Sequence, residues 1–265
     1  MKRETLITLA LAVAISLSLP GAANAQRGRG GGGAAATARS TVPADLIGYW
    51  VPVISEDWKF RMVTPPRGQS GNVPVSPEGR KVAESWDPAK DEAAGEQCRA
   101  YGAAGLMRLP VRLNITWEND NVLRIESDGG MQVRRLNFGQ SQIPTPPPDW
   151  QGYSVAQWQA GRGGGGGAPS VAGIGNSPNT PSGSLKVVTT RMRPGYLRKN
   201  GVPYGANATM TEYFESHLAP NGDRWLVITA IIEDPQNLNG QYVTSTNFKK
   251  QANNAGWSPS PCSAK

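Results

Sequence analysis

The feature that most constrains the fold is an alternation of apolar and polar residues with a period of two. In the segment 111–118, VRLNITWE, every second residue is apolar. This pattern is typical of a strand with one buried face and one wet face. The turn residues NDN at 119–121 lead into VLRIES at 122–127, and MQVRRLNF follows at 131–138. The pattern therefore predicts three consecutive antiparallel strands.

The rest of the chain predicts an all-β domain. One helix is expected at 76–86, because Ser76 can cap it and Pro77 suits its first turn. Many short strands, long loops and few helices favour an antiparallel up-and-down β-barrel of about 8–10 strands. Six further strands are predicted, at 46–54, 58–63, 185–192, 209–218, 225–233 and 242–249.

The segment 225–234, WLVITAIIED, is apolar on both faces of the predicted strand. A strand of this kind is normally covered on both sides. We therefore expect either the helix and long loops, or another subunit, to pack over the outside of the barrel there. The expected state is a monomer or a homodimer.

The N-terminus has the pattern of a secretory signal peptide over residues 1–25. Basic residues come first, an apolar stretch follows at 6–19, and Ala23-Asn24-Ala25 offers the small residues that signal peptidase requires. The apolar stretch is shorter than the roughly 20 residues needed to cross a bilayer. The chain is therefore expected to be periplasmic or secreted and not membrane-spanning.

After the predicted signal peptide, amino-acid composition distinguishes two glycine-rich stretches from the rest of the chain. Residues 26–41, rich in Gly, Ala and Arg, predict a flexible tail, since they offer few large apolar groups. A second glycine-rich stretch, 160–183, predicts a disordered insert within one β-barrel domain that spans 42–265.

The chain has two cysteines, Cys98 and Cys262. In an exported protein an even pair usually forms a disulfide, which would tie the C-terminal tail to the body of the domain. The alternative is a pair of inert thiols.

Candidate catalytic and metal sites are sparse. A serine triad would have to use the single histidine, His217, as its base, and ordinary metal sites need clustered histidines or thiolates. The acidic pairs Glu56-Asp57 and Glu233-Asp234 lack calcium-loop spacing. The sequence therefore gives no catalytic residue, metal ligand or cofactor, and it favours a protein that is not an enzyme while leaving that question open.

The formal charge of +7 is scattered in pairs such as Arg134-Arg135 and Lys249-Lys250. No known nucleic-acid reading motif accompanies it, so no nucleic-acid partner is expected. A solvated surface is one interpretation. The other is an acidic component of the cell envelope, or a protein partner, held by the loop 192–205, MRPGYLRKNGVPYG.

Two strands are expected to place an arginine inside the barrel. In the segment 131–138 the alternation cannot bury both halves without a bulge or an inward Arg134 or Arg135, and Arg191 shares a face with Val187. A buried arginine needs a counter-charge. An acid such as Glu212 or Glu233 could supply it, and so could an anionic ligand.

Gly48-Tyr49-Trp50, at the head of the first predicted strand, resembles the Gly-x-Trp signature of lipocalins. The resemblance implies a lipocalin-like (calycin) barrel, with the tryptophan closing the floor beneath an arginine from a late strand. The last predicted strand, YVTSTNFKK, offers lysines instead.

A longer likeness covers about 45–262. This part of the chain resembles a group of exported bacterial proteins to which no reaction is assigned. The resemblance rests on segments such as GYWVPVISEDWKFRMVTPP, ITWENDNVLRIE and LKVVTTRMRPGYLRKNGVPY. It supports export and the barrel fold, and it implies nothing about mechanism.

These observations predict a non-catalytic binding protein that holds a small apolar or amphipathic ligand inside the barrel. Desolvation of apolar surface would drive binding, and an inward arginine would orient an anionic head. The alternative is an interior filled by the protein's own side chains. The predicted ligand-binding residues are Tyr49, Trp50, Trp58, Phe60, Trp117, Arg135, Arg191, Phe214 and Trp225.

Overall fold

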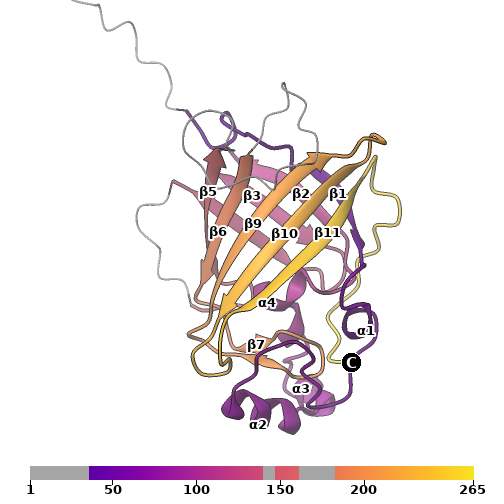
Figure 1. Ribbon diagram of the computed structural model, residues 1–265, viewed down its shortest axis with the longest axis vertical. Helices are drawn as coiled ribbons and strands as arrows, with labels where there is room; N and C mark the ends of the chain where they lie inside the picture. The colour runs from indigo at the N-terminus through magenta and orange to yellow at the C-terminus, as the bar shows by residue number, and fades with distance from the viewer. Residues whose placement is uncertain (1–35, 140–146, 161–182) are drawn as a thin grey trace, which may run out of the picture. The chain divides into compact units, whose positions relative to one another are not determined.

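Nine strands close into a β-barrel in the computed structural model, which describes residues 36–139, 147–160 and 183–265 (Figure 1). The predicted all-β barrel is therefore confirmed. Around the barrel the strand order is β1-β11-β10-β9-β6-β5-β4-β3-β2. The strands are β1 (Gly48–Val53), β2 (Leu113–Asn119), β3 (Val122–Ser127), β4 (Val133–Phe138), β5 (Tyr153–Ala160), β6 (Gly183–Thr190), β9 (Thr209–Leu218), β10 (Arg224–Glu233) and β11 (Tyr242–Gln251).

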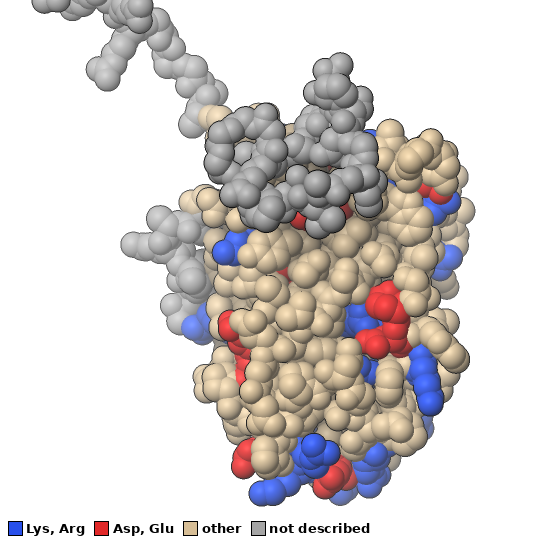
Figure 2. All heavy atoms as spheres, viewed as in Figure 1, with Lys and Arg blue, Asp and Glu red and all other residues tan. Residues whose placement is uncertain are grey.

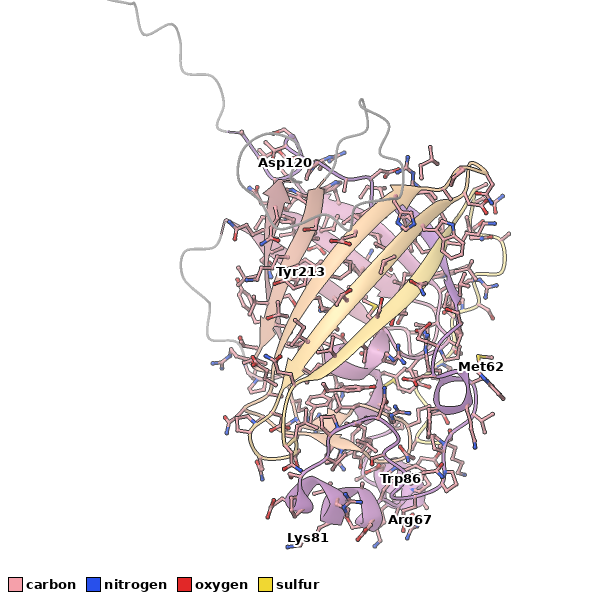
Figure 3. The ribbon with its side chains drawn as sticks, viewed as in Figure 1. Met62, Arg67, Lys81, Trp86, Asp120 and Tyr213 are labelled. Carbon is pink, nitrogen blue, oxygen red and sulfur yellow. A yellow bond between two sulfur atoms is a disulfide. The ribbon has the colours of Figure 1, made fainter. Side chains whose placement is uncertain are left out.

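The signal peptide predicted at 1–25 lies outside the described residues, as do 26–35 of the predicted tail and 161–182 of the predicted insert. Residues 36–41, which the composition also assigned to the tail, form a hydrogen-bonded turn. Its Arg39 backbone N–H donates to the Asp120 carbonyl at 3.0 Å, next to the β2–β3 turn (Figure 3). The Trp158 indole donates to the Ala38 carbonyl at 2.9 Å, so this segment packs on the upper end of the barrel.

The predicted meander is present: β2 pairs with β3 and β3 with β4, both antiparallel. The barrel departs from a purely antiparallel pattern at one pair, because β5 runs parallel to β4. β5 was not predicted from the sequence. Its inward positions include Ser154 and Ala156, and such small or polar residues hide the alternation.

The inward faces of the strands build the main core. In β10, Leu226, Ile228 and Ile232 are buried, while the alternate positions remain partly exposed. In the part of the chain that the structure describes, no helix lies over this outer face, which Figure 1 shows uncovered in front of the barrel. The helix therefore does not supply the external cover expected for the segment 225–234.

The predicted helix at 76–86 is confirmed as α2 (Pro77–Ser85). Ser76 Oγ accepts from the Gly79 N–H at 3.0 Å, and Pro77 occupies the first turn. Three further α-helices and one 3₁₀ helix were missed because each is six residues or shorter: α1 (Trp58–Arg61), α3 (Pro88–Ala93), η1 (Arg99–Tyr101) and α4 (Ala103–Leu106). They lie at the lower end of the barrel with a two-stranded sheet of β7 (Gly195–Tyr196) and β8 (Pro203–Tyr204) (Figure 1).

The strand predicted at 58–63 is wrong, because this segment contains α1. Asp57 takes a left-handed backbone conformation with φ of 50°, which turns the chain out of the direction of β1. The Phe60 and Arg61 N–H groups then donate to the Asp57 carbonyl. The alternation W-K-F-R-M-V imitated a strand, but Arg61 is the buried residue of this helix.

Trp50 sits fully buried in β1, and its indole donates to the Leu46 carbonyl at 2.9 Å. The Lys250 ammonium, from the last strand, lies 5.6 Å from the centre of the Trp50 ring. A lysine therefore occupies the place over this tryptophan where the lipocalin resemblance implies an arginine.

Candidate functional site

The barrel interior is crossed by a buried ion pair between β4 and β9. Arg134 donates to both carboxylate oxygens of Glu212, at 2.6 and 3.2 Å, and both side chains have no exposed surface. Arg134 also donates to Thr189 Oγ1 at 3.3 Å. Of the two arginines considered from the sequence, Arg134 is therefore the inward one, and an acid of the protein itself supplies the counter-charge.

Arg135 points outward, where it pairs with Glu118 at 2.8 Å and keeps about half of its side chain exposed. Arg191 follows the end of β6, in a left-handed conformation with φ of 57°. Arg135 therefore does not point into the barrel interior, and Arg191 lies beyond the end of the strand and is partly exposed.

The predicted aromatic residues are distributed over several places. Trp50 and Phe214 are fully buried in the core, and Trp117 packs against Phe138 and Trp158 in tilted ring contacts near the upper end. Tyr49 contacts Trp257 at a ring distance of 5.7 Å, and Trp225 lies on the outward side of β10. Trp58 and Phe60 are on α1, outside the barrel. The structure thus does not gather the nine predicted residues around one cavity.

A pocket of about 280 Å³ lies at the lower end of the barrel instead. Its walls come from segments far apart in the chain: residues 60–64 from α1 onward, 108–111 before β2, and 197–199 after β7. In Figure 2, acidic and basic side chains gather on the right of the view, at the height where Figure 1 draws α1. Met62, one of the lining residues, is labelled there in Figure 3.

One wall of this pocket is apolar. Tyr101, Leu109 and Val111 are buried residues of the main core cluster that reach the pocket, and Tyr242 at the start of β11 joins them. Leu197 continues the wall from the loop after β7. A bound molecule could therefore transfer apolar surface from water to this wall.

Three arginines, Arg61, Arg108 and Arg198, also line the pocket, and two acids, Glu56 and Asp57, pair with them; we call these five residues the arginine cluster. Arg61 and Arg108 both bind Glu56 Oε1, at 2.5 and 3.1 Å. Arg108 also binds Asp57 at 2.8 Å, and Arg198 lies 3.8 Å from the same carboxylate.

The cluster is fixed by contacts with the surrounding backbone and rings. Arg61 Nε donates to the Arg108 carbonyl at 3.0 Å, and Arg108 donates to the Ser245 carbonyl of β11 at 3.0 Å. The Arg198 guanidinium stacks 4.4 Å above the centre of the Phe60 ring. These contacts hold the guanidinium planes in defined positions before any ligand arrives.

Burial is the main reason that the pKa of Arg61 is lowered to about 10, and the neighbouring Arg108 charge adds to the effect. Glu56 and Asp57 act in the opposite direction. Arg61 therefore keeps its positive charge at neutral pH, in a site that is short of negative charge.

The C-terminal tail completes the pocket. The predicted disulfide between Cys98 and Cys262 is present, with an S–S distance of 2.04 Å. Two residues earlier in the tail, the Ser260 N–H donates to the Asp128 carbonyl at 3.0 Å, and Ser260 lines the pocket. The disulfide thus anchors the segment that supplies this part of the wall.

The basic loop 192–205 exposes less of its charge and fewer of its aromatic rings than the sequence suggested. Arg198, Tyr196 and Tyr204 are buried. Arg193 stacks on Trp150 at 4.3 Å and pairs with Glu96. Much of this loop is thus engaged in contacts within the protein.

Sequence reasoning missed most of the residues that line this pocket. It assigned Phe60 to a ligand site and noted the Glu56-Asp57 pair, but it singled out neither Arg61 nor Arg108. No periodic signal joins the contributing segments, because most of them are loops or single helical turns. The only local clue was the density of charge in EDWKFR at 56–61.

Comparisons with known protein families, with characterised proteins and with solved structures gave no match for this chain. Within the described ranges, no group of three or more histidine, cysteine, aspartate or glutamate side chains is arranged to hold a metal ion. Nor does any helix of those ranges have the length and apolar character needed to cross a membrane. The geometry of the pocket is thus the basis for a functional proposal.

Proposed function

We propose that this chain is an exported binding protein that holds a small apolar or amphipathic molecule in the pocket at the lower end of its barrel. The observation that carries the proposal is the pocket itself, about 280 Å³ in volume, whose lining combines buried apolar residues with the arginines of a fixed cluster. Ligand sites commonly combine a mostly apolar lining with a few well-placed polar groups.

The proposal moves the ligand from the interior of the barrel to its end. Large side chains such as Trp50, Phe214 and Phe248 fill the interior, and the Arg134–Glu212 pair crosses it. At the lower end, by contrast, the helices and the C-terminal tail surround unfilled space. Export remains part of the proposal, and its support is the signal-peptide pattern at 1–25.

Because the pocket has an apolar lining, the affinity for a ligand is expected to depend on the length of the ligand's alkyl chain. Each methylene group that leaves water contributes about 0.8 kcal/mol, which corresponds to about a fourfold gain in affinity. For the purified protein we therefore expect the Kd to fall about fourfold per carbon from butanol to octanol. Isothermal titration calorimetry measures this series, and a Kd that does not change with chain length would contradict binding to an apolar wall.

A bulky substitution in the lining tests the location. Thr64 lines the pocket and is partly exposed, so Thr64→Trp is expected to occupy the space and weaken octanol binding at least about tenfold, the effect of 1.4 kcal/mol. The matched control is Thr211→Trp, because Thr211 is a partly exposed threonine on the outer face of β9. Equal affinities for the two variants would place the ligand elsewhere.

A further inference from the structure

We infer that the molecule bound in this pocket carries an anionic head group, a carboxylate or a phosphate ester, which Arg61 and Arg198 hold while its apolar body lies against the apolar lining residues. The inference rests on the proposed function, since it assigns the ligand class of the same pocket. Arg61 and Arg198 would then be the residues that determine specificity.

The first support is the charge of the cluster. Three arginines with side-chain exposures of 2%, 9% and 6% face the two carboxylates of Glu56 and Asp57. The cluster therefore has one more positive than negative charge. A positive charge out of water is costly unless an anion accompanies it. The Arg134–Glu212 pair provides the contrast, because there one carboxylate matches one guanidinium.

The second support is unused hydrogen-bonding capacity. Arg61 Nη2 and Arg198 Nε are buried and have no acceptor in the described part of the chain. An unpaired N–H is not by itself a site, since Arg134 Nε inside the filled barrel has none either. Arg61 and Arg198 differ from Arg134 because other atoms of the same two side chains line a pocket with room for a guest, while the unpaired N–H groups themselves have almost no accessible surface.

The third support is that the site is built before binding. Gly71 lies so close beneath Phe60 that an added Cβ would be 3.0 Å from its ring and 3.4 Å from the Arg198 guanidinium. Phe60 and Arg198 are thereby kept in a tight stack. A planar guanidinium held in this way suits the oxygen pair of a carboxylate or phosphate, because its N–H groups form a rigid fork.

The apolar wall narrows the class further. Inorganic phosphate or acetate would bind the arginines but leave the apolar surface of Leu109, Val111 and Tyr242 in contact with water. An amphipathic anion would bind the arginines with its head group and cover this apolar surface with its body. The volume of about 280 Å³ is close to the lower limit of roughly 300 Å³ for small-molecule sites, which favours a short alkyl or aromatic body.

Calorimetry with molecules of one chain length and different heads tests this inference. The probes are octanoate, octyl phosphate and octanol. Acetate and inorganic phosphate serve as anions that carry the same charged groups but lack the octyl chain. We expect octanoate and octyl phosphate to bind at least about tenfold more tightly than octanol, because hydrogen bonds to charged groups are the strong ones. Acetate and phosphate are expected to bind far more weakly than their octyl counterparts.

Two variants test the assigned residues. Arg198→Met keeps an apolar contact with Phe60 and removes the guanidinium, so it should abolish the preference for octanoate over octanol. Arg61→Met should do the same. The matched control is Arg135→Met, an arginine on the outside of the barrel, which should retain the preference.

The outcomes are distinct. Equal affinity of the wild-type protein for octanoate and octanol would overturn the inference and leave the proposed function standing. A preference for the anion that survives in both variants would also overturn the assignment. Absence of binding by every octyl probe would overturn the proposed function together with the inference. The comparison of heads in the wild-type protein does not depend on how well either variant folds.

Discussion

Glu212→Gln is expected to lower the free energy of unfolding by about 3 to 5 kcal/mol, the largest effect of any single substitution considered for this protein. Glutamine keeps the shape of the side chain but leaves the Arg134 guanidinium without its negative partner in a place with no exposure to solvent. Urea denaturation followed by tryptophan fluorescence measures the change.

The matched control is Glu118→Gln, which removes the partner of the neighbouring Arg135 on the outside of the same strand. An exposed pair contributes about 0 to 1 kcal/mol, so this variant should be close to the wild-type protein. A second comparison replaces both members of the buried pair, Arg134→Met with Glu212→Leu. That double variant should recover most of the stability lost by Glu212→Gln. Similar losses for Glu212→Gln and Glu118→Gln would show that the pair is not buried.

The second large effect is expected from the disulfide. Replacing Cys98 and Cys262 by serine should lower the free energy of unfolding by about 2 to 5 kcal/mol, since the bond closes a long loop, with a sequence separation of 164 residues. Ligand affinity should fall as well, because Ser260 is then held less firmly against Asp128.

Reductant provides the control for this variant. Dithiothreitol should destabilise the wild-type protein by about as much as the two substitutions do, and it should leave the double serine variant unchanged. Stability that is insensitive both to reductant and to the substitutions would mean that the bond contributes nothing to the folded state.

The fold could be predicted from the sequence wherever the signal was local. Alternation in β2 and β3 indicates which side of each strand is buried, and the residues at 119–121 between them are typical turn residues. The same rule misjudged residues 58–63, where one left-handed residue, Asp57, converts an alternating segment into a helical turn. Backbone conformation at a single position is not visible in a hydrophobic pattern.

The candidate site could not be predicted in the same way. Its cationic side combines residues before β2, after β1 and after β7, so it exists only once the tertiary structure brings them together. The sequence did predict an arginine inside the barrel, with an acid such as Glu212 or Glu233, or an anionic ligand, as its counter-charge. It left open whether this was Arg134 or Arg135, because both satisfy the pattern until the register of β4 against β3 is known.

The pairing of β1 with β11 means that the two ends of the domain close the barrel. During synthesis β1 emerges before the other barrel strands, whereas β11, its neighbour on one side, is the last of the nine to emerge. Closure of the barrel therefore has to wait until all nine strands have been made, and contacts between such remote segments are typical of slow folding. If the chain is exported as proposed, this delay would favour secretion, because a translocation channel accepts a chain that has not yet folded.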